Sequence, residues 1–311
     1  MKKRKILITG GGGFIGSNLI YNLQDDYKIV CFDTGKNYKG LKKIINSNVV
    51  LEKGDVSNER VLKKILNGVD IVIHLAGGGG NEAAVSDPIW AIKTHLVGTQ
   101  KLLEACLYRK VKKIIFSSTV FVYDSKEGDK KVEKSPANPD SFYGFLKKSA
   151  EEEIIKSKMN YNILRFSNVY GNYLFGGLPD KGAMYKFVNS CFHKKPMLIY
   201  GSGSQTINYL NIKDIIPVIK KMLLDNQNNA IYNVVSQRSI TIEELAGIIK
   251  DIFHKKLKKS VFVKKIPVMS EKIYSYPGVD SSRAREYFDW KNETALEKGI
   301  EEIIIKQNEN Y

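Results

Sequence analysis

The chain of 311 residues contains very few cysteines and no long apolar run. Its three cysteines, Cys31, Cys106 and Cys191, are too few and too scattered for a disulfide framework or a paired-cysteine metal site. No stretch of 18 apolar residues is present, so no segment is suited to cross a membrane as a helix. We therefore expect a cytoplasmic protein with reduced, buried cysteines, no metal site and no membrane attachment.

Arginine is also scarce, since only seven arginines accompany a large number of lysines. The formal net charge is nevertheless +16. The lysines occur in pairs along the chain, such as Lys42-Lys43 and Lys112-Lys113, without an aromatic-interleaved basic block. Arginine is the usual bidentate ligand of phosphate and guanine. We therefore predict a solvated basic surface that attracts anionic substrates and does not bind nucleic acid.

Short apolar runs alternate with helical patterns in the first half of the chain. This alternation predicts parallel strands joined by crossover helices, and hence a doubly wound α/β (Rossmann) fold. The second half is less regular, although Thr241 and Glu244 form the sequence pattern of a capping box. We predict a dinucleotide-binding domain over 1–170 and a smaller α/β substrate lobe over 171–311. The boundary is nominal, because we expect the chain to return from the lobe to the first domain. The predicted strands are 5–9, 28–32, 49–51, 70–75, 114–117 and 161–166, and the main predicted helices are 14–23, 88–108, 143–156 and 241–252.

A glycine-rich segment, Thr9–Gly16, lies directly after the first predicted strand and opens the first predicted helix. Glycines let the backbone approach a pyrophosphate closely, and a helix N-terminus offers free N–H groups to it. Asp33 follows at the end of the second strand, where an acidic side chain can bind the adenosine ribose hydroxyls. A carboxylate there repels a 2′-phosphate, so the pattern predicts NAD rather than NADP. The loop residues assigned to the cofactor are Gly10, Gly13, Phe14, Ile15 and Gly16.

Tyr143 and Lys147 form a YxxxK pattern on a predicted helix, where the i, i+4 spacing places both side chains on one face. A phenol has a pKa of about 10 and is a poor base at neutral pH. A neighbouring ammonium and a positively charged nicotinamide would lower that pKa. We predict Tyr143 as the acid/base group and Lys147 as its activator and as a ligand of the nicotinamide ribose.

The GxxGxxG spacing of the glycine loop, together with YxxxK, resembles the extended short-chain dehydrogenase/reductase family, in particular its sugar-nucleotide epimerase and dehydratase branch. Further segments resemble this family over almost the whole chain: Gly54-Asp55-Val56, His74–Gly77, Gly98-Thr99, Arg165–Gly171, Gly201–Thr206, Asp280–Ala284 and Trp290. The resemblance implies a homodimer through the helices near 90–108 and 143–157. It also implies a second group of cofactor contacts: Asp55, Val56, Leu75, Ala76, Gly77, Ser117, Tyr143 and Lys147.

The resemblance also assigns the substrate side of the site. In this branch the catalytic Ser or Thr lies four residues before the Tyr of a Val-Tyr pair, and in this chain that residue is Thr119. The resemblance therefore implies Thr119 as the third catalytic residue, with Ser118 as the alternative. The implied substrate is a nucleotide sugar. The implied substrate contacts are Ser118, Thr119, Asn168, Tyr200 and Tyr209.

Two departures from the family pattern narrow the predicted activity. Dehydratases of this branch carry Asp-Glu after the threonine, whereas this chain has Val120 and Phe121, which cannot transfer protons. The glutamate expected of the decarboxylases is absent as well. We therefore predict an NAD-dependent sugar-nucleotide 4-epimerase that acts through a transient 4-keto sugar. The alternatives are an NAD(P)-dependent C4 dehydrogenase or ketoreductase of a nucleotide-linked sugar, and a non-catalytic NAD-binding or RNA-associated protein.

Two further positions differ from the family without an obvious replacement. Ile207 stands where the family places an arginine that binds the substrate diphosphate. His95 occupies the asparagine position of the NxxGT segment, and we expect it to be structural. Candidate cations for the diphosphate are Lys213, Lys264, Lys265 and Lys272.

Overall fold

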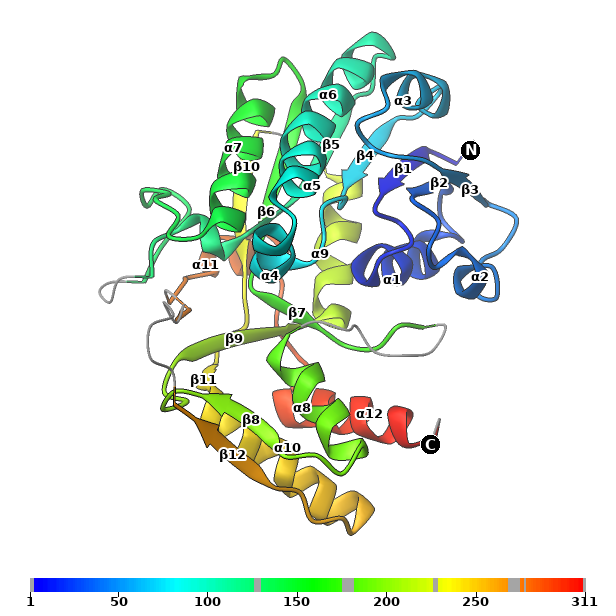
Figure 1. Ribbon diagram of the computed structural model, residues 1–311. Helices are drawn as coiled ribbons and strands as arrows, with labels where there is room; N and C mark the ends of the chain where they lie inside the picture. The colour runs from blue at the N-terminus through cyan, green and yellow to red at the C-terminus, as the bar shows by residue number, and fades with distance from the viewer. Residues whose placement is uncertain are drawn as a thin grey trace.

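The computed structural model describes residues 3–125, 130–174, 182–225, 229–267, 275–276 and 278–309. Its centre is a seven-stranded, fully parallel sheet with the strand order β10-β6-β5-β4-β1-β2-β3 (Figure 1). The predicted doubly wound fold is therefore confirmed. The strands are β1 Lys5–Thr9, β2 Lys28–Asp33, β3 Val49–Lys53, β4 Ile71–His74, β5 Lys113–Thr119, β6 Asn160–Phe166 and β10 Ala230–Val234.

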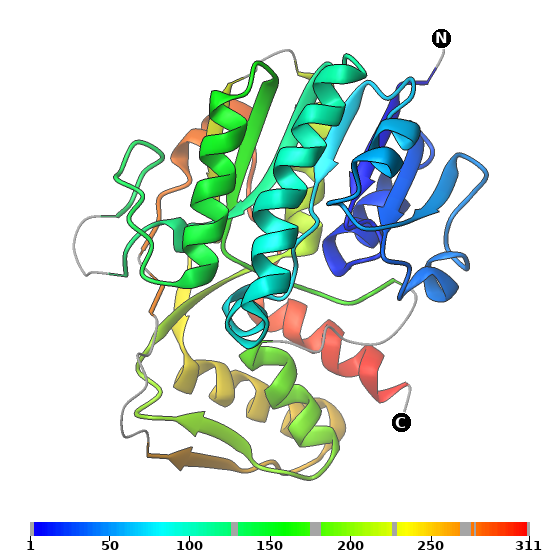
Figure 2. The ribbon, with the colours of Figure 1, turned by 45° about the horizontal axis from the view of Figure 1, so that its top comes forward.

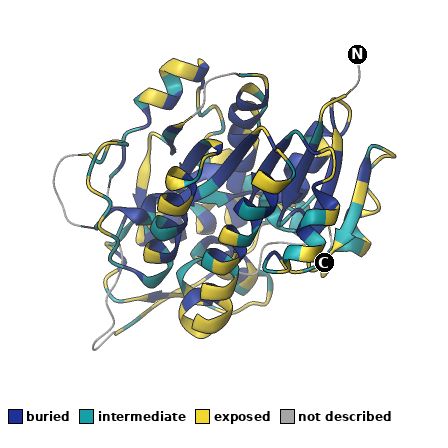
Figure 3. Cartoon of the chain, turned by 90° about the horizontal axis from the view of Figure 1, so that it is seen from above, coloured by how far each residue is buried: buried dark blue, intermediate teal, exposed yellow. Residues whose placement is uncertain are grey.

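Helices cover both faces of this sheet, because alternate strand residues face opposite sides. Ile6 and Ile8 of β1 pack with α1 and α9, whereas Leu7 packs with α3, α6 and α7. The inner strands are buried on both faces (Figure 3), which explains why they appear in the sequence as continuous apolar runs. The packing helices are α1 Phe14–Leu23, α3 Glu59–Ile65, α6 Gly98–Tyr108, α7 Phe142–Lys156, α9 Ile212–Leu224 and α11 Ser282–Phe288, and a short α2 spans Tyr38–Leu41.

The long helix predicted over 88–108 is interrupted. α5 spans Pro88–Ile92, a π-helical turn η1 spans Lys93–Val97, and α6 continues from Gly98. Turns of this kind are rare and are found mostly at functional sites. The apolar spacing alone could not reveal the wider turn, because one extra residue in a helical turn changes the pattern very little. A short helix, α4 Gly80–Ser86, precedes α5.

The remaining elements form a smaller lobe below the carboxyl ends of the main strands (Figure 1). It has a three-stranded sheet, β11-β9-β7, and a two-stranded sheet, β12-β8, packed with helices around a separate core. The capping box of Thr241 and Glu244 is present at the start of α10. The lobe elements are β7 Asn168–Tyr170, α8 Ala183–Phe192, β8 Met197–Tyr200, β9 Thr206–Asn211, β11 Ser239–Thr241, α10 Ile242–Leu257, β12 Val263–Ile266 and α12 Leu296–Asn308.

The chain passes between the two parts more than once. After β9 it returns to the main sheet through α9 and β10, enters the lobe again, and comes back with α11 (Figure 2). The lobe is thus held to the sheet by several crossings. No helix in the described part of the chain is long and apolar enough to cross a membrane.

Candidate active site

A cavity of about 690 Å³ lies at the carboxyl ends of the central strands. This is the position at which open parallel sheets bind their ligands. The glycine loop and the acidic residues Asp33 and Asp55 line one part of it, and Ser117, Tyr143 and Lys147 line another. Nearly all of the residues that the sequence assigned to the cofactor, the substrate or catalysis line this cavity: Gly10, Gly13, Phe14, Ile15, Gly16, Asp33, Asp55, Val56, Leu75, Ala76, Gly77, Ser117, Ser118, Thr119, Tyr143, Lys147 and Asn168.

The backbone of the glycine loop is packed too closely to leave room for a side chain at Gly10 or Gly16. Gly10 has φ +67°, and a Cβ on Gly16 would lie 2.4 Å from the Gly10 carbonyl oxygen. α1 begins directly after the loop, with no side-chain cap and no acidic residue in its first turn. Its first N–H groups therefore stay available to an anion at the cavity wall. This geometry fits a pyrophosphate.

Asp33 is fixed at the end of β2 beside that loop. Its carboxylate accepts hydrogen bonds from the Gly12 N–H at 3.1 Å and the Gly35 N–H at 3.3 Å. Asp55, at the next strand end, accepts from the Ser57 N–H at 2.8 Å and pairs with Lys93 at 3.1 Å. The pKa of Asp55 is lowered, because these hydrogen bonds and Lys93 outweigh the opposing effect of its burial. Both carboxylates line the cavity, Asp55 in its ionised form, and Asp33 lies where it can bind ribose hydroxyls.

Tyr143 and Lys147 lie on the first two turns of α7, which begins after the Ser141 cap. Lys147 Nζ donates to the Ser117 carbonyl at 2.8 Å and lies 6.0 Å from the centre of the Tyr143 ring. Burial lowers the pKa of Lys147 to about 7, against the opposing effect of the Glu151 carboxylate. Burial also raises the pKa of Tyr143. The predicted lowering of the phenol pKa is thus not a property of the protein alone, and desolvation dominates until a positively charged ligand is bound.

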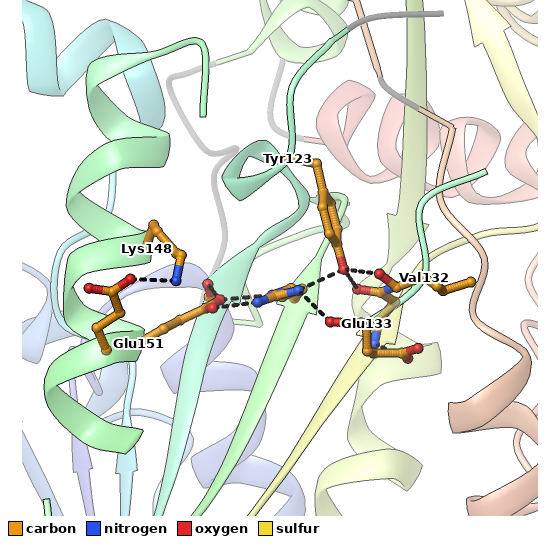
Figure 4. Close-up of polar contacts among 9 residues, drawn as sticks. Tyr123, Val132, Glu133, Lys148 and Glu151 are labelled. Carbon is orange, nitrogen blue, oxygen red and sulfur yellow. Dashed lines mark hydrogen bonds and ion pairs between the residues drawn. The ribbon is translucent and has the colours of Figure 1, made fainter. Parts of the chain in front are cut away.

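A buried network behind these residues was not found from the sequence. Ser118 Oγ donates a short hydrogen bond to the carboxylate of Glu151, which is fully buried one turn beyond Lys147 on α7. Arg165 of β6 binds the same carboxylate through Nε at 2.9 Å and Nη2 at 2.6 Å. The guanidinium also donates through Nη1 to the Tyr123 hydroxyl at 2.7 Å, so it links Glu151 to Tyr123, and Figure 4 labels these two residues at either end of the network. The network fixes the catalytic helix to β5 and β6.

The sequence contained a signal for this network. Glu151 lies four residues after Lys147, on the same helix face as Tyr143 and Lys147. A carboxylate on the buried face of a helix requires a partner of opposite charge. Arg165 is the charged residue of the predicted buried strand 161–166, which makes it the candidate partner.

His95 lies in the π-helical turn next to the site. Its ring packs edge-to-face against Tyr143 at 5.7 Å, and a Cβ on Gly77 would lie 2.5 Å from its Nδ1. Burial lowers the pKa of His95 to about 2, with Lys147 contributing, so the ring is neutral. The side chain therefore fills the space behind Gly77 and supports Tyr143.

Two residues assigned to the substrate do not reach the cavity. Tyr200 is 57% exposed on β8, and Tyr209 is buried on β9 with its ring against Tyr170. Strand alternation explains both positions: Tyr209 points into the lobe core, and Tyr200 points away from it. Asn168 does line the cavity, and its Nδ2 donates to the Asn208 carbonyl at 3.3 Å.

The cation that would bind a substrate diphosphate remains unassigned. Ile207 packs partly buried against the lobe core. Lys213 pairs with Glu302 at 2.6 Å, and Lys265 pairs with Glu243 at 2.8 Å. Among the described residues, neither these lysines nor Lys264 lines the cavity, and Lys272 lies outside the described residues.

One charged pair spans the two parts of the protein at the cavity. Glu82 of α4 lines the cavity and pairs with Lys186 of α8 at 3.0 Å. Within the described chain, Glu82, Asp33 and Asp55 are the carboxylates that line the cavity, and Lys147 is its lining cation. The described residues contain no group of three or more side chains placed to hold a metal ion.

The arrangement can hold a dinucleotide and transfer a proton. The glycine loop and Asp33 fit the pyrophosphate and ribose of NAD, which when bound supplies a hydride acceptor and a positive charge. Thr119 lies at the end of β5 with its hydroxyl accepting from the Phe121 N–H at 3.3 Å, so the hydroxyl proton remains free to donate. Thr119 and Tyr143 line the same cavity as a donor and a potential base for a substrate hydroxyl.

Comparison with known proteins identifies the family. The model of the NAD dependent epimerase/dehydratase family matches residues 6–235. A dTDP-D-glucose 4,6-dehydratase of Dictyostelium discoideum is 32% identical over 273 residues, which are 80% of this chain and 62% of that protein. A UDP-N-acetyl-alpha-D-glucosaminuronate decarboxylase of Bacillus cytotoxicus is 27% identical, with 97% of each chain covered.

Solved structures agree with the sequence relatives. A UDP-N-acetylglucosamine 4-epimerase from Methanobrevibacter ruminantium, in complex with UDP-N-acetylmuramic acid, superposes over the full length of both chains with a TM-score of 0.87 and 27% identity. The similar proteins thus include an epimerase, a dehydratase and a decarboxylase of nucleotide sugars. This chain belongs to the NAD-dependent epimerase/dehydratase family, with NAD as its cofactor.

Proposed function

We propose that this protein is a cytoplasmic, NAD-dependent sugar-nucleotide 4-epimerase that acts through a transient 4-keto sugar. Tyr143 takes the proton of the C4 hydroxyl, while Thr119 holds that oxygen and Lys147 stabilises the phenolate. NAD held by the glycine loop and Asp33 would supply the hydride acceptor for C4 and, after the keto sugar has rotated, the hydride donor for its opposite face. Tyr143 returns the proton to the C4 oxygen, and the reaction needs no net oxidant because the hydride also returns to C4.

The observation that carries this proposal is the side chain next to Thr119. Phe121 lines the cavity and Val120 is fully buried. These are the two positions at which the family resemblance implies Asp-Glu in a dehydratase. Neither side chain can transfer a proton to eliminate water. Glu82, the remaining carboxylate away from the cofactor end, is 63% exposed and paired with Lys186. The described site therefore has the groups for oxidation and reduction at C4 and lacks the acids for elimination.

The test is to incubate the purified protein with UDP-hexoses, UDP-N-acetylhexosamines and UDP-hexuronic acids without added cofactor, and to follow the C4 proton by NMR. We expect inversion at C4 with one of these substrates and NAD retained through purification. Loss of the C6 hydroxyl or release of CO₂ would overturn the proposal. Turnover that requires added cofactor and changes its redox state would favour the C4 dehydrogenase or ketoreductase.

We also propose a homodimer through the outer faces of α5, α6 and α7. These helices expose large apolar side chains, including Ile89 at 76%, Tyr108 and Phe145. An apolar surface of this extent on neighbouring helices is typical of a protein interface. Light scattering should give twice the chain mass of 35.2 kDa, and Phe145→Asp should shift it toward the monomer. A wild-type monomer at micromolar concentration would contradict this proposal.

A further inference from the structure

The net charge of the chain is concentrated in two short segments. Residues 192–203 and 252–267 together contain eight lysines and no aspartate or glutamate. These 28 residues thus carry half of the net charge of +16, and the rest of the chain is much closer to balance. We call these lysines the basic tip: Lys194, Lys195, Lys255, Lys256, Lys258, Lys259, Lys264 and Lys265.

The fold brings both segments together along the outer side of the smaller lobe. β8 and β12 pair in parallel, and the Met197 N–H donates to the Phe262 carbonyl at 2.8 Å. Lys259 Nζ lies 5.6 Å from the centre of the Phe192 ring, which joins the end of α10 to the end of α8. Figures 1 and 2 show β8, β12 and the ends of α8 and α10 on the side of the molecule away from the main sheet.

The basic tip has few counter-charges. All eight lysines are exposed. Lys256 pairs with Glu301 at 2.6 Å and Lys265 with Glu243. The other six have no ion pair within the described chain. Six uncompensated ammonium groups on this side of the lobe repel one another and favour an anionic partner.

Apolar side chains are exposed among these lysines. Phe262 is 71% exposed, and Leu198 and Val263 are exposed beside it on β8 and β12. Clustered lysines with exposed apolar side chains match an anionic lipid surface, which accepts charge at its headgroups and apolar groups just below them. A nucleic acid is a poorer match, because neither segment contains an arginine.

The sequence alone predicts no membrane attachment, but from this surface we propose that the basic tip docks this protein onto an anionic membrane surface. The lysines lie at the headgroup phosphates and Phe262 lies at the boundary with the acyl chains. None of the basic-tip lysines lines the catalytic cavity. Docking therefore leaves the cavity open, and the proposal holds whichever sugar reaction the enzyme performs.

The first experiment is co-sedimentation of the full chain with vesicles of phosphatidylcholine, with and without phosphatidylglycerol, at low and high salt. We expect binding only when phosphatidylglycerol is present, and weaker binding in high salt because the charges are screened. Absence of binding to the anionic vesicles, or equal binding to both kinds, would overturn the proposal.

The second experiment locates the surface. The triple variant Lys195→Gln/Lys255→Gln/Lys259→Gln should weaken vesicle binding by about tenfold or more, because each lysine near an anionic surface contributes severalfold. The control Lys39→Gln/Lys42→Gln/Lys43→Gln removes the same charge from exposed positions elsewhere and should bind as the wild type does. Unchanged NAD affinity shows that both variants are folded. An equal loss of vesicle binding in the two triple variants would overturn the proposal, because it would indicate that the vesicles attract the net charge of the protein and not the basic tip.

Two further measurements separate the chemistries. Phe262→Ser should weaken the binding that persists at high salt, because it removes the apolar contribution. In a parallel assay, wild-type protein is mixed with single-stranded RNA. If the chain bound RNA through the same three lysines and did not bind the vesicles, the partner would be a nucleic acid and the proposal would fail.

Discussion

The two parts of this protein contribute very unequally to the cavity. The main sheet supplies the glycine loop, both adenosine-side carboxylates and the residues Thr119, Tyr143 and Lys147. The smaller lobe reaches the same cavity mainly through Asn168, Tyr173 and Gly182. The sheet side thus carries the groups of the proposed proton transfer and the proposed NAD site, whereas the lobe side carries little charge. In the proposed reaction, the chemistry therefore belongs to the sheet, and substrate selection depends on a few lobe contacts.

The largest expected effect compares one tyrosine from each part. Tyr143→Phe should lower kcat by about 10²–10⁴-fold, because it removes the acid/base group, while NAD affinity stays nearly unchanged. Tyr200→Phe should leave kcat close to wild type, since that side chain lies outside the cavity. Steady-state kinetics on the accepted nucleotide sugar measure both. Equal losses in the two variants would break the proposed division between sheet and lobe.

The next effect tests how the catalytic helix is held. Glu151→Gln leaves Arg165 buried without its counter-charge and should reduce the free energy of unfolding by about 3–5 kcal/mol. Glu152→Gln, one residue along α7, affects only the solvent-facing pair with Lys148 and should change stability little. Urea denaturation gives both values. A stable Glu151→Gln protein would show that the network does not fix α7 to the sheet.

A pH effect of intermediate size arises from Lys147. Its pKa is about 7 in the folded protein and about 10.4 when unfolded, so the folded state disfavours the ammonium. Wild type should therefore gain stability relative to Lys147→Met as the pH rises above about 7, by at most about 1.4 kcal/mol per pH unit. Below pH 7 the difference should be constant. Thermal unfolding of both proteins without NAD at pH 6 and pH 9 measures this difference in stability. A difference that does not change with pH would contradict the lowered pKa of Lys147.

The smallest effect compares two glycines. Gly247→Ala lies on the exposed face of α10 in open space and should stabilise the lobe by about 0.5–1 kcal/mol. Gly16→Ala places a methyl group against the Gly10 carbonyl and should weaken NAD binding severalfold or more. Calorimetry with NAD and thermal unfolding measure these changes. Tight NAD binding by Gly16→Ala would mean that the loop does not need its close packing.

Much of the sheet could be predicted from the sequence. Its strands are continuous apolar runs, and the glycine loop and YxxxK are local patterns in which spacing alone sets geometry. The lobe strands β8, β11 and β12 were harder to predict, because short strands with mixed exposure give weak periodicity. The π-helical turn at His95 was missed because one additional residue leaves the apolar pattern almost unchanged.

The sequence by itself determined the family and the cofactor of this protein, because the glycine loop and the YxxxK pair are local patterns. It also supplied the residues of the proposed reaction, which are close together along the chain or follow consecutive parallel strands. Only the tertiary structure decided the contacts between distant segments. It paired Glu151 with Arg165, turned Tyr200 and Tyr209 away from the cavity, and brought lysines from 194–195 and 255–265 to one side of the lobe. Local spacing fixes which side chains share a helix face or a strand end. The packing of the lobe fixes which distant surfaces meet, and no local pattern encodes that.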